Sequence, residues 1–136
     1  MAVRQRILVI DDDVQLVDSM TVLLESVGYE VSHSYRAEHG VELARAMRPD
    51  LILLDVMFAG PPGPDGFEVS RMLRDDPELH TVPVIIMSGV RKLLDLPYDI
   101  RPDDTWMPVK AFLEKPVKPG KLIAEIEAVI GPRTAQ

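Results

Sequence analysis

Acidic, hydroxyl and amino side chains each come directly after a short apolar run of this sequence. The acids are Asp11, Asp12 and Asp55, the hydroxyl is Ser88 and the amine is Lys115. If the carboxylates lie together they repel, since two unit charges ~4 Å apart cost about 4 kcal/mol at an effective dielectric constant of about 20. A divalent cation would cancel that repulsion, and an all-oxygen ligand set suits Mg²⁺. With a hydroxyl and an ammonium opposite the cation, these side chains predict a receptor for a phosphoryl group.

The sequence also indicates how a phosphoryl group would be held. Neither glycine-rich nucleotide loop, G-x-x-x-x-G-K-[ST] or G-x-G-x-x-G, is present in it. We therefore expect the phosphoryl group to be bound covalently rather than as part of a nucleotide. The central carboxylate, Asp55, is then the expected acceptor and forms an aspartyl phosphate.

Five short runs predict the β-strands that position these side chains. The runs are residues 6–10, 29–34, 50–54, 82–87 and 110–114. The third contains four consecutive aliphatic side chains without polar alternation, which is typical of a strand buried on both faces of a parallel sheet. The second is more polar and is expected at an edge of the sheet.

Apolar residues at helical spacing lie between these strands. They predict helices at about residues 16–27, 37–47, 66–75 and 119–130. In the third of these helices Phe67, Met72 and Leu73 are expected to face the core. Strands that alternate with helices predict an α/β fold, with a doubly wound parallel sheet of five strands and helices on both faces.

The distribution of the chemical residues predicts the order of the strands. The first, third, fourth and fifth strands each end in one of them, and the second does not. In the flavodoxin-like order 2-1-3-4-5, the ligand crevice lies between strands 1 and 3, and strand 2 lies outside it. We therefore predict this order, with all the chemical side chains at the carboxyl edge of the sheet.

Composition limits the class of protein. The 136 residues predict a single domain over 1–136, with a core at about 5–131. The net charge of −7 argues against a nucleic-acid partner, because phosphate contacts need a basic surface. Without a cysteine, a signal sequence or an apolar run long enough for a membrane, the chain is expected in the cytoplasm.

Five motifs, taken in order, resemble the receiver domain of two-component response regulators. They are Ile7–Asp13, Leu51–Met57, Asp65–Glu68, Ile86–Gly89 and Phe112–Pro116. The resemblance covers nearly the whole chain and is specific because all five motifs occur together. It implies a phosphorylation-dependent signalling switch, not an enzyme with an external substrate. Such a domain catalyses only its own phosphorylation and slow dephosphorylation.

The resemblance also implies a role for each site residue. Asp55 would accept the phosphoryl group from a histidine kinase or a histidine phosphotransfer protein. Asp12, Asp55 and the carbonyl of Met57 would bind Mg²⁺, with Asp11 assisting through water. Asp13 is expected to cap the following helix rather than to bind the cation.

On the opposite side of the pocket, the resemblance implies donors and a switch. Lys115 would pair with the phosphoryl oxygens, Ser88 would hydrogen-bond one of them, and Phe112 would be the aromatic that moves with Ser88. The bond between Lys115 and Pro116 is expected to be cis, as is usual in the family.

Two departures from the family pattern bear on the output of the domain. The loop between Asp55 and Asp65 is a few residues longer than usual, and so is the span from Ser88 to Lys115. Prolines in the second span allow only a short fourth helix, so that the surface usually used for output is altered.

We expect a stand-alone receiver domain, monomeric or weakly dimeric, with an unidentified downstream protein partner. The alternative is a constitutive interaction module that is never phosphorylated. An aspartate-dependent hydrolase is a third interpretation, but it needs an acid where Met57 stands.

Overall fold

In the described residues, five parallel strands form one sheet in the order β2-β1-β3-β4-β5. The computed structural model describes residues 4–55, 66–88 and 109–131. The strands are β1 (Arg6–Ile10), β2 (Glu30–Ser34), β3 (Leu51–Asp55), β4 (Val84–Ser88) and β5 (Val109–Glu114). The helices are α1 (Val14–Ser26), α2 (Ala37–Met47), α3 (Gly66–Asp75) and α4 (Pro119–Ile130). The predicted α/β fold and strand order are confirmed. The predicted short fourth helix, between Ser88 and Lys115, lies outside the described residues.

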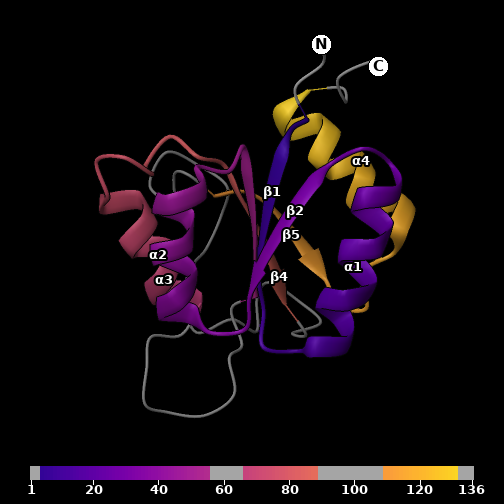
Figure 1. Cartoon of the computed structure of the whole chain (residues 1–136), viewed down its shortest axis with the longest axis horizontal. Helices are drawn as coiled ribbons and strands as arrows, with labels where there is room; N and C mark the ends of the chain where they lie inside the picture. The colour runs from indigo at the N-terminus through magenta and orange to yellow at the C-terminus, as the bar shows by residue number, and fades with distance from the viewer. Residues whose placement is uncertain (1–3, 56–65, 89–108, 132–136) are drawn as a thin grey trace.

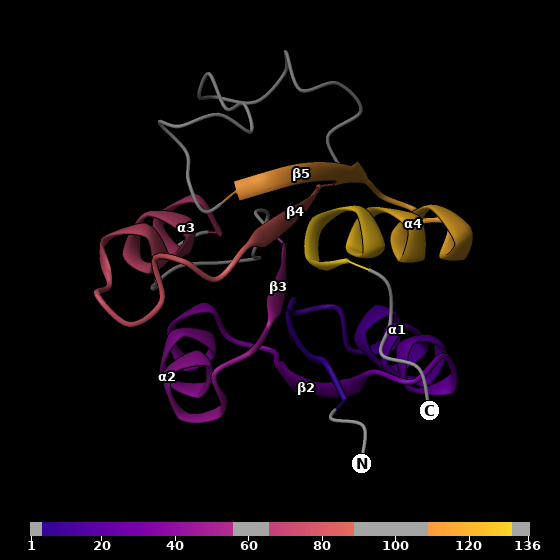
Figure 2. The same cartoon turned by 90° about the horizontal axis from the view of Figure 1, so that it is seen from above.

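Helices cover both faces of the sheet. Figures 1 and 2 show α2 and α3 on one side and α1 and α4 on the other. Alternate residues of β1 point to the two sides: Leu8 and Ile10 pack under α2 and α3, and Ile7 and Val9 pack under α1 and α4. Every residue of β3 is buried, as a central strand in a covered parallel sheet requires.

The ends of the first two helices follow from local residue chemistry. Asp13 caps α1, because its carboxylate accepts a hydrogen bond from the backbone N–H of Leu16 at 3.1 Å, as predicted. Gly28 follows α1 at a φ of 106°, a conformation that a side chain would strain. Helix α2 ends at Met47, and Arg48 caps it in the left-handed region, directly before Pro49.

One predicted core residue is wrong. Met72 in α3 is 44% exposed, whereas Val69 and Leu73 are fully buried. These two residues lie four positions apart on one helical stripe, and Met72 lies at the solvent side of that stripe. The side chain of Phe67 lies outside the described part of the structure.

The buried carboxylate of Asp76 ties α2 to the end of α3. Its Oδ2 accepts a hydrogen bond from Arg45 Nε at 2.7 Å, and its Oδ1 accepts one from the backbone N–H of Glu78 at 2.8 Å. The bond from Glu78, followed by the bond from Arg45, lowers the pKa of Asp76, although burial acts to raise it. The ionised carboxylate is therefore the form that the folded chain favours.

Asp76→Asn is expected to lower the urea midpoint of unfolding at neutral pH. A carboxyl whose pKa is lowered by folding contributes stability above its ordinary pKa and loses that contribution as the pH falls through the lowered value. The difference from the wild-type chain should therefore be largest at neutral pH and shrink below about pH 4. Asp75→Asn, at an exposed neighbouring acid, is the control and should change little. A difference that stays constant down to about pH 3 would contradict this assignment.

Candidate functional site

The carboxyl ends of the strands bring the predicted chemical residues to one edge of the sheet. Asp55 is the last residue of β3, and Asp11 comes directly after β1, whose last residue pairs with Leu54. Lys115 follows β5, which is separated from β3 by β4. Its long side chain reaches past the end of β4 to the neighbouring ends of β1 and β3.

The ammonium of Lys115 lies between two buried carboxylates. Its Nζ is 2.8 Å from Oδ2 of Asp11 and 3.4 Å from Oδ1 of Asp55. Asp11 is 0% exposed and Asp55 is 1% exposed. The other oxygen of Asp11, Oδ1, accepts a hydrogen bond from the backbone N–H of Asp13 at 2.9 Å. Asp11 is therefore fixed at both oxygens and is the nearer of the two partners of Lys115.

The two carboxylates keep Lys115 in its charged form. Burial acts to lower the pKa of Lys115, but the close ion pair with Asp11 and the negative charge of Asp55 outweigh it. The net result is a pKa raised above the ordinary lysine value. A permanent positive charge thus faces Asp55 at every physiological pH.

Three carboxylates at this edge form a candidate cation site. Asp11, Asp12 and Asp55 each offer one oxygen, and these oxygens lie within 4.8 Å of one another. Three carboxylates converge here beside the ammonium of Lys115, and a further cation at this edge would lessen the repulsion between them. A hard, all-oxygen donor set of this kind suits Mg²⁺ better than the softer transition metals.

The predicted site residues are thus partly placed by the structure. Asp11, Asp12, Asp55 and Lys115 lie together, and the peptide bond between Lys115 and Pro116 is cis as expected. Ser88 ends β4, and Phe112 in β5 pairs with Ile86, but their side chains lie outside the described part of the structure. Met57 lies outside it altogether. The close contact between Lys115 and Asp11 was not predicted, because the sequence indicated only that Lys115 would pair with the phosphoryl oxygens.

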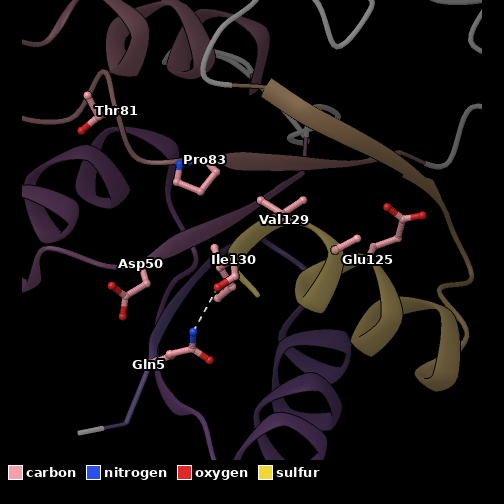
Figure 3. Close-up of a pocket in the computed structure, with 8 residues that line it drawn as sticks. Gln5, Asp50, Thr81, Pro83, Glu125, Val129 and Ile130 are labelled. Atoms are coloured by element: carbon pink, nitrogen blue, oxygen red, sulfur yellow. Dashed lines mark hydrogen bonds between the residues drawn. The ribbon is translucent and has the colours of Figure 1, made fainter. Parts of the chain in front are cut away.

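A pocket lies at the opposite, amino-terminal edge of the sheet from the acidic cluster (Figure 3). Its volume is about 710 Å³. Gln5, Asp50 and Pro83 line it beside the last turn of α4, and Gln5 Nε2 donates a hydrogen bond to the carbonyl of Ile130 at 3.3 Å. None of the site carboxylates lines this pocket.

None of the helices in the described residues is long and apolar enough to cross a bilayer.

Comparison with solved structures supports the fold. A putative response regulator from Chloroflexus aurantiacus superposes with a TM-score of 0.80 at 21% identity, over 96% of this chain and 100% of that one.

Comparison of sequences supports the family. The chain is 33% identical over 127 residues to the DNA-binding response regulator MtrA of Mycolicibacterium paratuberculosis, over 92% of this chain and 51% of that protein. It thus spans about half the length of MtrA. It is also 33% identical over 128 residues to protein PilH of Pseudomonas aeruginosa, over 92% of this chain and 97% of PilH. A sequence model of the family "Response regulator receiver domain" matches residues 7–127, and the chain belongs to that family.

Proposed function

We propose that this chain is a phosphorylation-dependent switch whose phosphoryl acceptor is Asp55. The observation that carries the proposal is the ammonium of Lys115, 3.4 Å from Asp55 Oδ1, beside the converging carboxylates of Asp11 and Asp12. This arrangement pairs a nucleophile with a cation for the incoming phosphoryl oxygens. The donor is a phosphohistidine on a histidine kinase or on a histidine phosphotransfer protein.

The proposed transfer forms one bond and breaks one. A carboxylate oxygen of Asp55 attacks phosphorus, and the bond between phosphorus and the donor imidazole nitrogen breaks with its electron pair going to that nitrogen. Lys115 donates hydrogen bonds to the phosphoryl oxygens, and Asp11 orients it. Asp11, Asp12, Asp55 and the carbonyl of Met57 would hold a magnesium ion, which supplies positive charge to the phosphoryl oxygens.

The proposed output is a change of shape at the ends of β4 and β5. Phosphorylation adds a charge of roughly −1.5 to −2 to Asp55. In the switch that the sequence predicts, Ser88 hydrogen-bonds the new oxygens and Phe112 follows it. Two arrangements of this region would then differ in affinity for a downstream protein. The proposed setting is the cytoplasm, with the chain acting as a single receiver domain, monomeric or weakly dimeric.

Acetyl phosphate with Mg²⁺, followed by intact-mass measurement, tests the proposal. We expect one phosphate adduct on the wild-type chain and none on Asp55→Ala. Asp75→Ala removes an exposed acid near the end of α3 and should keep the adduct. If neither acetyl phosphate nor a panel of phosphorylated histidine kinases labels the wild-type chain, the constitutive interaction module is the better interpretation.

A further inference from the structure

Helix α2 approaches β1 so closely at Gly40 that no side chain fits between them. A Cβ at Gly40 would lie 2.6 Å from Cδ1 of Ile10, 2.9 Å from its Cγ1 and 3.0 Å from its Cγ2. Ile10 is fully buried and is the last residue of β1. The next residue along the chain is Asp11, the carboxylate that holds Lys115.

The end of β1 has little freedom to move away from Gly40. Residues of β1 pair with β2 on one side and with β3 on the other, and Ile10 itself pairs with Ser34 and Leu54. The side chain of Ile10 is branched at Cβ, which limits it to few rotamers. It also packs in the core beneath α2 and α3. Added bulk at Gly40 would therefore push on the end of β1, next to Asp11.

Two hydrogen bonds hold the carboxyl-terminal half of α2. Arg45 Nε donates a hydrogen bond to the buried carboxylate of Asp76 at 2.7 Å. Arg6 Nη1 donates a hydrogen bond to the carbonyl of Met47, the last residue of α2, at 2.8 Å. Because these bonds hold the carboxyl-terminal half of α2, a displacement caused at Gly40 would fall mainly on its first turn.

The first turn of α2 is itself bonded to the acidic site. The backbone N–H of Gly40 donates to the carbonyl of Arg36 at 3.0 Å. Ser34 Oγ donates to the carbonyl of Arg36 at 2.8 Å and accepts from its N–H at 3.2 Å. The carbonyl of Ser34 accepts from the backbone N–H of Asp11 at 3.1 Å. Through these hydrogen bonds, a displacement of the first turn of α2 would also shift Asp11.

We propose that Gly40 is a positioning residue for the acidic pocket. Because Gly40 has no side chain, α2 packs against Ile10 closely enough to fix the position of Asp11. Asp11 in turn fixes the position of Lys115. The functional consequence rests on the proposed function, because it assumes that the pocket binds a divalent cation and a phosphoryl group.

Gly40→Ala is expected to weaken Mg²⁺ binding about tenfold and to slow phosphorylation by acetyl phosphate at saturating Mg²⁺. Backbone amide resonances of Asp11, Asp12 and Asp13 should shift even without Mg²⁺. Ile10→Val removes Cδ1, the nearest of the three contacting atoms, and leaves two γ carbons at 2.9 and 3.0 Å. Gly40→Ala in that background should therefore recover part of the affinity and move the amides part of the way back.

Two controls separate this effect from a general loss of stability. Gly120→Ala makes the same chemical change in α4, where a Cβ would meet nothing within 4 Å, and should leave Mg²⁺ affinity unchanged. Ile126→Val removes a buried methylene on the other face of the sheet, which lowers stability without touching α2. It should also leave Mg²⁺ affinity unchanged.

Each outcome decides the question. Wild-type Mg²⁺ affinity in Gly40→Ala, with unmoved amides at Asp11–Asp13, overturns the proposal. If the wild-type chain itself binds no Mg²⁺, the proposed function fails, and the amide shifts in Gly40→Ala still decide the positioning role. If Gly40→Ala does not fold, folding of the double variant with Ile10→Val supports the contact, and failure of both variants to fold counts against the contact at Cδ1 as the cause.

Discussion

Lys115→Met is expected to lower the free energy of unfolding by about 2 kcal/mol at neutral pH without Mg²⁺. The substitution leaves Asp11 and Asp55, which are almost completely buried, without the ammonium that lies between them. Loss of one partner from a fully buried ion pair costs about 3–5 kcal/mol, and the lower value allows for the 22% exposure of the Lys115 side chain. Urea unfolding of the two chains measures the difference.

The pH dependence of this effect has a definite sign. Because folding raises the pKa of Lys115, its contribution is fully present below the ordinary lysine value and is lost only as the pH rises through the raised value. The difference between the chains should therefore be constant from about pH 6 to about pH 9. Lys121→Met, at an exposed lysine of α4, is the matched control and should change stability little. Equal urea midpoints for Lys115→Met and the wild-type chain would contradict the prediction.

The strands and the edge they share could be predicted from the sequence because both depend on local signals. An apolar run such as residues 51–54 reports burial on both faces, and a carboxylate directly after it reports the carboxyl edge of the sheet. The gathering of Asp11, Asp12 and Asp55 follows from strand order, and the structure confirms both. The periodicity of α3 was weaker evidence, since it did not separate Met72 from the buried stripe.

Contacts between distant elements could not be predicted in the same way. The approach of Gly40 to Ile10 depends on how deeply α2 settles on the sheet, and no local pattern reports that depth. The bond between Arg45 and Asp76 joins residues 31 positions apart, and each alone reads as an ordinary surface charge. Lys115 had two equivalent acids within its reach, so that only the geometry shows Asp11 as the nearer one.

Mg²⁺ is expected to stabilise the wild-type chain by about 2.7 kcal/mol when its concentration is about 100 times the dissociation constant. The reason is that the carboxylates of Asp11, Asp12 and Asp55 converge only in the folded chain, so that the cation binds the folded state. Asp12→Asn removes one charge from the set. At the same Mg²⁺ concentration we expect the increment to fall below about 1.5 kcal/mol, as a tenfold or greater loss of affinity requires.

Asp13, the acid next to Asp12, supplies a control whose substitution should change stability in the opposite direction. Asp13→Ala removes the cap of α1 and should lower stability by about 1 kcal/mol without Mg²⁺, while leaving the Mg²⁺ increment intact. Asp12→Asn should instead raise stability without Mg²⁺, because it relieves repulsion among the three carboxylates. Asp12→Asn should therefore be the more stable variant without Mg²⁺ and the variant with the smaller Mg²⁺ increment. A general loss of folding cannot produce that crossed pattern, whereas a cation held by Asp12 beside a helix cap at Asp13 requires it. Equal Mg²⁺ increments in the two variants would remove Asp12 from the cation site.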